Sequence, residues 1–239
     1  YGRPESLAAP IYQQLESKGN FKLLLACINK AGYAATLKGA GYYTMFAPND
    51  VAFTKFLSDR GVSSVDQLDS ATCNKIVTFA LVYNAFSAAR LPDYQASSGW
   101  VLNNAFKRRT AHYTGFYDDT TYAGTPVKAL GANRNPGFVL GDNNNKYITY
   151  FTSNYMNAKG LSASDYNFFY PTSTYTGFNV GPAKVVTPDI VAENGFIHEV
   201  DQVMMPFASL DKYLASNPQY SEFKKLFDKY MVSFTLNPE

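Results

Sequence analysis

The chain has 239 residues, of which 46% are apolar, and its 21 Lys and Arg against 19 Asp and Glu leave a net charge of only +2. This length predicts one large domain, or one domain and part of another. The balanced charge argues against a nucleic-acid partner, which needs a concentrated basic field, and no apolar run approaches the roughly 18 residues of a membrane helix.

The first forty residues predict two helices. Pro10 precedes a short apolar and polar stretch that can form the first helix. Apolar residues at helical spacing from Phe21 to Ile28 predict a second helix, with Asn20 as its N-cap and Gly32 at its end.

Residues 42–53, YYTMFAPNDVAF, predict a strand that turns sharply into a helix. Pro48 removes a ladder donor and ends the strand, and Asn49 can cap the helix by accepting a hydrogen bond from a backbone N–H. We expect this unit to bury Phe46 and Phe53 in one core and to be a corner of the fold rather than a reactive centre.

The rest of the chain is rich in predicted strands. Asp69 begins a further amphipathic helix that runs into LVYNAF, and Ser162 can cap a brief helix over 162–170. The predicted strands are WVLNNAF, RRTAHYTGFY, KYITYFT and AKVVTPDIV. Asn194-Gly195 predicts a tight hairpin turn that pairs 183–191 with 196–204. Helices first and strands later indicate an α+β fold, an antiparallel β-sandwich or wedge with the N-terminal helices packed alongside.

Two stretches of the chain resemble the two signatures of the fasciclin domain family. The first signature is matched at Phe46, Ala47, Pro48, Ala52 and Phe53. The second is matched at Asp189, Ile190, Asn194, Gly195, Ile197, His198, Asp201 and Pro206. The likeness covers about 10–206, and it implies the fasciclin fold for that region.

The chain departs from the family pattern in two places. Asn84 stands where family members commonly have the His of a Tyr-His pair. Residues from about 110 to 180 look like a long insertion carrying Tyr-rich polar segments. We therefore expect a fasciclin-like domain over 1–206 with this insertion. Residues 207–239, which match the first helices in outline, are expected to begin a second repeat or to form C-terminal helices of the same domain.

The resemblance implies a non-enzymatic, extracellular cell-adhesion or attachment module that presents an aromatic-rich surface to a cell-surface or matrix protein or a glycan. In adhesive relatives an Asp-Ile pair at this place contacts integrin, which makes Asp189 and Ile190 candidates, although a hairpin and a local turn would use the same residues. Tyr150, Tyr155 and Tyr175 are candidates because tyrosine gives large contact area at low entropic cost.

Two other functions fit the same residues. The module can bind carbohydrate for a bacterial surface glycan-uptake system, or it can be a spacer. No Asn-x-Ser/Thr acceptor occurs, which fits a bacterial source. The family resemblance then implies the bacterial cell surface at the outer membrane, with a lipid anchor upstream of residue 1 as the only membrane contact.

Little in the sequence predicts chemistry. The two histidines, His112 and His198, lie in no catalytic motif, and a hydrogen-bonded structural role is expected for His198. The Asn-rich stretch 141–147 offers either a calcium loop or a simple turn, and it lacks the carboxylates that calcium needs. We expect no enzyme activity, metal or cofactor. Cys27 and Cys73 are either buried free thiols or one disulfide.

Overall fold

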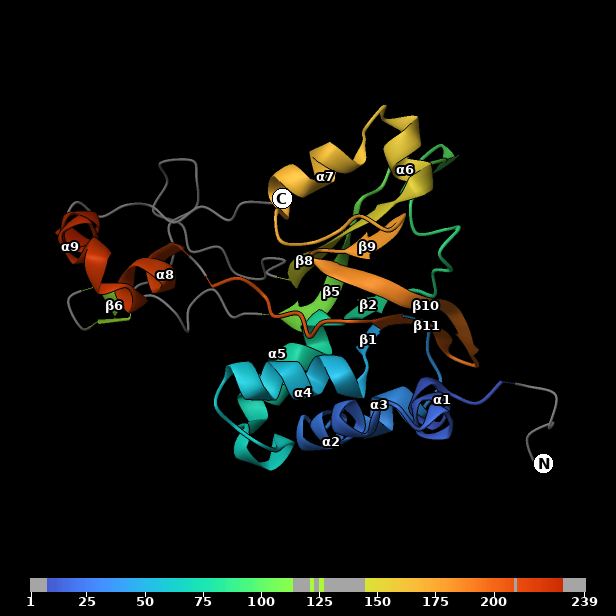
Figure 1. The fold of residues 1–239 in the computed structure, drawn as a ribbon, viewed down its shortest axis with the longest axis horizontal. Coiled ribbons are helices and arrows are strands. Elements are labelled where there is room, and N and C mark those ends of the chain that lie inside the picture. Colours follow the sequence, from blue (N-terminus) through green and yellow to red (C-terminus); the bar gives the residue numbers. More distant parts are fainter. Residues whose placement is uncertain (1–7, 114–120, 123–124, 127–144, 209, 230–239) are drawn as a thin grey trace. The chain divides into compact units, whose positions relative to one another are not determined.

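The computed structural model describes residues 8–113, 121–122, 125–126, 145–208 and 210–229. The chain divides into two compact units, one made of residues 1–112 and 147–205 and the other of residues 113–146 and 206–239. In the first unit, α1 to α4 lie on one side of the barrel strands, and α6 and α7 lie on the other (Figure 1).

The helices and strands of the first unit follow the predicted order, helices mostly first. Its helices are α1 (Ile11–Lys18), α2 (Lys22–Lys30), α3 (Ala34–Lys38), α4 (Asp50–Asp59), α5 (Ser70–Phe79), α6 (Ser153–Ala158) and α7 (Ala163–Phe169), with a 3₁₀ turn η1 (Val65–Gln67). Its strands are β1 (Tyr43–Pro48), β2 (Leu81–Tyr83), β3 (Tyr94–Ala96), β4 (Gly99–Val101), β5 (Lys107–Tyr113), β8 (Asn145–Thr152), β9 (Phe178–Val180), β10 (Ala183–Ala192) and β11 (Gly195–Val200).

The main sheet is a closed barrel in the order β1–β11–β10–β9–β8–β5–β2. The mixture of helices and strands is as expected, but the antiparallel sandwich is corrected, because β1 runs parallel to β11 and the sheet closes on itself. Met45 lies opposite Ile197 in the parallel pair, so the two signatures form neighbouring strands. The 110–180 region supplies β8 and β9 to the barrel, so it is not only inserted surface material.

Side chains on opposite faces of β1 and β11 enter two separate cores, because successive residues of a strand alternate in direction. Met45 and Ile197 face the helices and pack with Leu24 and Phe53. Phe46 points into the barrel, where it packs with Tyr150 and other apolar side chains. The expectation that Phe46 and Phe53 share one core is therefore wrong, because Phe46 packs inside the barrel and Phe53 packs in the core between barrel and helices.

The helix caps are mostly local. The Asn49 carboxamide oxygen accepts a hydrogen bond from the Ala52 N–H at 3.0 Å, as predicted. The prediction for Asn20 is wrong: α2 has no side-chain cap of its own, and the Asp50 carboxylate accepts a hydrogen bond from the Leu23 N–H at 2.8 Å. The start of α2 is thus stabilised from α4.

The β10–β11 hairpin exists, but its turn differs from the prediction. Ala192 lies opposite Gly195, so the two turn residues are Glu193 and Asn194, and Gly195 opens β11. The Asn194 side chain is needed elsewhere: its oxygen accepts a hydrogen bond from the Ile11 N–H at 2.8 Å. Its amide donates to the carbonyls of Leu37 and Gly39 at 3.0 and 2.8 Å. This residue therefore ties α1 and the end of α3 to the barrel.

Two further signature positions have structural contacts. Asp201 accepts a hydrogen bond from the Lys184 N–H at 2.7 Å and so joins the end of β11 to the start of β10. Asn84 has a positive φ of 74°, a conformation that Asn tolerates better than most residues. Pro48 ends β1 opposite Val200.

The second unit contains short elements. They are β6 (Thr121–Tyr122), β7 (Thr125–Pro126), α8 (Leu210–Ser216), the 3₁₀ turn η2 (Pro218–Tyr220) and α9 (Ser221–Lys229). A short helix, a break and a second helix follow one another here as they do in α1 and α2. That residues 207–239 begin a second repeat stays a prediction.

Candidate functional site

His198 connects three parts of the barrel from inside. Its Nδ1 accepts a hydrogen bond from the Asp189 N–H at 3.2 Å, so its Nε2 carries the proton that is donated to the Phe86 carbonyl at 3.0 Å. Its ring stacks on Phe46 and meets Phe178 edge-on, with centroids 5.6 and 5.4 Å away. These contacts hold an irregular stretch of β10 in place.

Asp189 and Ile190, the predicted partner residues, also make internal contacts. Asp189 has a positive φ of 57°, and its carboxylate accepts a hydrogen bond from the Ala88 N–H at 2.7 Å. Ile190 lies opposite Ile197 and packs at the edge of the helix-facing core. Turn formation and hairpin packing thus account for these two side chains, although the Asp189 residue is exposed.

Stability should depend on pH through His198. The pKa of His198 is lowered overall, because the effect of burial outweighs those of the Phe86 carbonyl and the Asp189 carboxylate, which raise it. The unfolded chain takes up a proton near pH 6.5, whereas the folded chain does so only at lower pH, so acid favours unfolding. We expect the free energy of unfolding to fall below pH 6.5 by up to about 1.4 kcal/mol per pH unit.

Urea unfolding at pH 7.5, 6.0 and 5.5 measures this dependence. The variant His198→Gln cannot titrate at this position, and it should show a shallower slope than the unaltered chain over that range. Equal slopes would mean that His198 does not hold its neutral form in the fold.

The three candidate tyrosines lie in different environments. Tyr150 has no exposed surface, and its hydroxyl donates a hydrogen bond to the Leu91 carbonyl at 2.7 Å inside the barrel. The prediction that Tyr150 contacts a partner is therefore wrong for the folded chain. Tyr175 is half-buried, 5.5 Å from Tyr166 between ring centroids. Tyr155 on α6 is half-buried and lies against Phe106, with ring centroids 5.6 Å apart.

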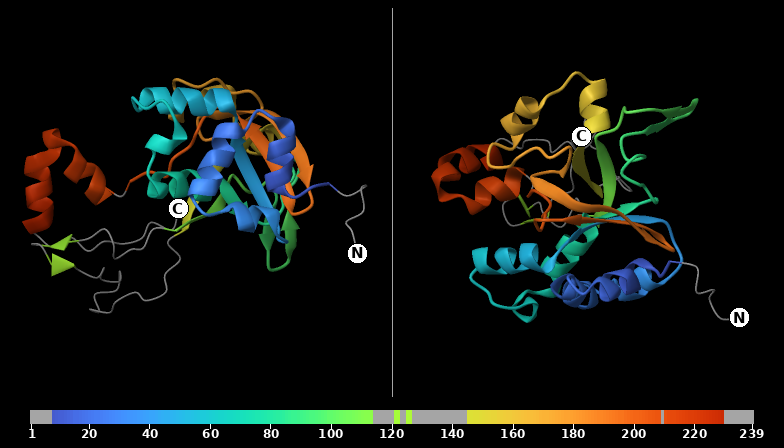
Figure 2. Two further views of the ribbon diagram at one scale, coloured as in Figure 1. Left: turned by 90° about the horizontal axis from the view of Figure 1, so that it is seen from below. Right: turned by 45° about the vertical axis from the view of Figure 1, so that its right-hand side comes forward.

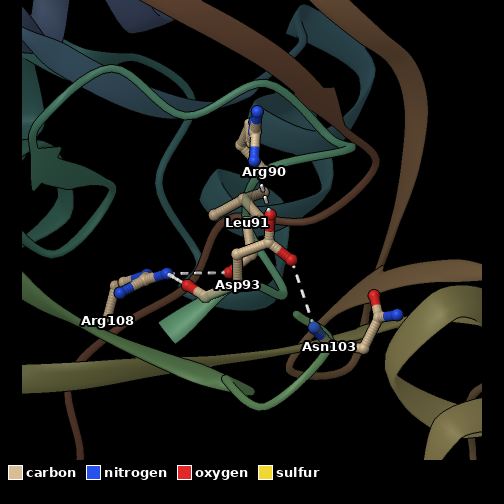
Figure 3. Close-up of polar contacts among 5 residues, drawn as sticks. All are labelled: Arg90, Leu91, Asp93, Asn103 and Arg108. Atoms are coloured by element: carbon tan, nitrogen blue, oxygen red, sulfur yellow. Dashed lines mark hydrogen bonds and ion pairs between the residues drawn. The ribbon is translucent and has the colours of Figure 1, made fainter. Parts of the chain in front are cut away.

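A buried polar cluster fixes the chain between β2 and β5. The Asp93 carboxylate is buried, and it pairs with Arg90 at 3.1 Å and accepts a hydrogen bond from the Asn103 N–H at 3.1 Å. The Arg108 guanidinium donates to the carbonyls of Leu91 and Asp93 (Figure 3). Because Asp93 and Asn103 flank the β3–β4 hairpin, the cluster clamps the base of that hairpin.

The clamped hairpin carries exposed aromatic and apolar side chains, and we call it the aromatic ribbon. Its large side chains are Tyr94, Trp100, Val101 and Leu102, with 49, 49, 41 and 65% of their surface exposed. The green β3–β4 hairpin extends away from the barrel in the right-hand view of Figure 2. Sequence reasoning placed a strand here but missed the exposed surface. The small residues Ser97, Ser98 and Gly99, which lie at the turn between the two short strands, were the available hairpin signal.

Reactive chemistry has little support among the described residues. They contain no group of three or more His, Cys, Asp or Glu side chains placed to hold a metal ion. In the calcium candidate at 141–147, residues 141–144, which carry the candidate ligands Asp142, Asn143 and Asn144, lie outside them. Cys27 and Cys73 are free and buried, and burial raises the pKa of both thiols. No helix in the described part of the chain is long and apolar enough to cross a membrane.

Comparison with known proteins identifies the fold family. A solved structure of a FAS1 domain pair from the insect cell adhesion molecule Fasciclin I is similar to this chain, with 13% identity and a TM-score of 0.31. The match covers 90% of this chain and 51% of that one, so this chain spans about half its length. No curated protein matches. A family model described as "Fasciclin domain" matches residues 19–128 and 144–206, and the chain therefore belongs to the fasciclin domain family.

Proposed function

We propose that the chain is an extracellular attachment module that presents an aromatic surface to a protein or glycan partner. Fasciclin domains are associated with cell adhesion and are generally non-enzymatic. The proposed surface consists of the aromatic ribbon together with Phe106 and Tyr155. Asp189 and Ile190 are left out of it because their side chains serve contacts within the fold.

The observation that carries this proposal is the exposure of Tyr94, Trp100 and Leu102 on a ribbon whose base is fixed. Exposed apolar groups that lie together mark interaction sites more often than single exposed residues do. Buried contacts of Asp93 and Arg108 hold the ribbon in place before a partner arrives. A surface that is already ordered loses less entropy on binding, which favours affinity.

The location belongs to the same proposal. Fasciclin domains are typically extracellular or surface-associated. We place this module on the bacterial outer surface, held by a lipid anchor upstream of residue 1. Growth with labelled palmitate, followed by capture of the full-length protein, tests the anchor.

A second candidate function is carbohydrate binding for a glycan-uptake system. The observation that favours it is the position of Phe106 and Tyr155, whose rings lie together beside cationic side chains. Rings of this kind can stack on the apolar faces of sugars.

The proposed function predicts that the double variant Tyr94→Ser/Trp100→Ser loses attachment. The protein is coupled to beads and tested on immobilised matrix proteins and polysaccharides. Tryptophan is prominent among interface residues whose truncation costs about 2 kcal/mol or more, so binding should weaken roughly 30-fold. Both side chains are half exposed, and the melting temperature should change little.

The matched control is Phe168→Ser/Phe169→Ser. These two rings on α7 are 80 and 71% exposed but lie outside the proposed surface. Attachment that survives the ribbon variant, or that both variants lose equally, would contradict the proposed function.

A further inference from the structure

Three cations, on the outer face of β5 and at the end of α6, have no ion-pair partner among the described residues. Lys107, Arg109 and Ala111 share the outward face of β5 by strand alternation. The helices cover Ala111, whereas Arg109 is exposed and Lys107 half-exposed. Lys159 follows α6 and is exposed. In the described part of the chain, the ion pairs involve other residues.

These cations alternate with aromatic rings in one continuous strip. Arg109 and Lys107 lie 5.9 and 5.3 Å from the centre of the Tyr147 ring. Lys107 also lies 5.6 Å from the Phe106 ring, which meets the Tyr155 ring at 5.6 Å. We call the set Arg109, Tyr147, Lys107, Phe106, Tyr155 and Lys159 the cation–aromatic strip.

The strip ends in a cation that is also held in place. Lys159 lies 6.0 Å from the Tyr155 ring, and its ammonium donates a hydrogen bond to the Asn104 side chain at 2.5 Å. Cation–ring contacts at exposed sites are weak. They leave the positive charge without an acidic partner among the described residues, so an anion at the strip meets three cations beside aromatic rings.

We propose that this strip binds an acidic polysaccharide, one that carries carboxylate or sulfate groups on its sugar rings. This proposal rests on the proposed function and names a partner for that surface, because the cation–aromatic strip and the proposed surface share Phe106 and Tyr155. Aromatic rings take the apolar faces of sugars, and the neighbouring cations form charge-assisted hydrogen bonds with the acidic groups. A neutral glycan would use the rings alone.

Other polyanions fit less well. Nucleic-acid binding relies on neutralising many phosphates along an extended basic surface. This chain has a net charge of only +2, and the strip offers only three cations, Lys107, Arg109 and Lys159. A polysaccharide with spaced acidic groups and exposed ring faces matches such an alternation better than a densely charged strand does.

The test measures binding of the full chain to immobilised polyuronate, sulfated dextran and neutral dextran at several salt concentrations. We expect binding to at least one acidic polymer, no measurable binding to neutral dextran and a fall in affinity with salt. The first two polymers separate carboxylate from sulfate recognition. The triple variant Lys107→Gln/Arg109→Gln/Lys159→Gln should bind at least tenfold more weakly and with a shallower salt dependence.

Two control variants make the result specific. Lys18→Gln/Lys22→Gln/Lys75→Gln removes the same charge from exposed positions elsewhere and should bind normally. Phe106→Ala should weaken binding without changing the salt dependence. Equal loss in the charge control, equal binding to neutral dextran or tighter binding to a single-stranded oligonucleotide would overturn the proposal.

Its failure can be told apart from failure of the proposed function. If no acidic polymer binds but a protein partner is lost in Tyr94→Ser/Trp100→Ser, only this inference falls. If neither surface variant changes any attachment, both fall.

Discussion

Replacing Gly195 by alanine is expected to lower the free energy of unfolding by about 3 kcal/mol or more, through steric overlap and an unfavourable backbone conformation. An added Cβ would overlap the carbonyl oxygen of Tyr43 and lie 2.7 Å from the Tyr43 carbonyl carbon. These are backbone atoms of β1, and they cannot move aside as a flexible side chain can. Gly195 also has a φ of 147°, which L-residues with a side chain rarely adopt.

Urea unfolding followed by circular dichroism measures this effect. Gly61→Ala is the matched control, because Gly61 has a positive φ of 69° but open space around the added Cβ. The backbone strain alone should cost about 1–2 kcal/mol there. If the two variants lose equal stability, close approach of β11 to β1 is not what requires glycine at position 195.

Asn194→Ala is expected to cost about 3–5 kcal/mol, because one buried polar group that loses its partner costs about 1–3 kcal/mol and three groups lose theirs. Asn194 is 1% exposed, and water cannot readily replace its side chain. The groups that lose their hydrogen bonds are the N–H of Ile11 and the carbonyls of Leu37 and Gly39. They lie on the N-terminal helices, so the variant should also loosen α1.

Urea unfolding gives the overall cost, and amide exchange of Ile11 reports the local one. Asn157→Ala, an exposed position on α6, should change stability by less than about 0.5 kcal/mol. A cost below about 1 kcal/mol for Asn194→Ala would show that its hydrogen bonds contribute little net stability to the fold.

The features that could be read from the sequence are mostly local ones. Asn49 and Asp69 cap helices through hydrogen bonds to residues three positions ahead, and such contacts depend on neighbours in the chain. The Ser162 cap and the helix after it follow the same rule. The long signatures also identified the family, since they specify a strand pair rather than a single element.

The missed features depend on contacts between distant segments. Asn194 has the sequence context of a turn residue, yet its side chain serves residues 155 to 183 positions away. Tyr150 lies in a Tyr-rich polar stretch, but strand alternation directs it into the barrel. Neither position carries a local signal for its environment. The candidate surface was missed for a different reason: its hairpin had a local turn signal, but its fixed position depends on the clamp that joins Asp93 to Asn103 and Arg108, 10 and 15 positions ahead.

The pairing of β1 with β11 has a consequence for how the chain is made. These strands come from opposite ends of the barrel sequence, and Asn49 bonds to Glu199 across 150 positions. During synthesis, most of the barrel sequence must follow β1 before its partner strand β11 leaves the ribosome. Contacts so distant slow folding and leave apolar strand surface open in the interval. Chaperones or a secretion channel that accepts unfolded chains would therefore meet this protein before its barrel closes.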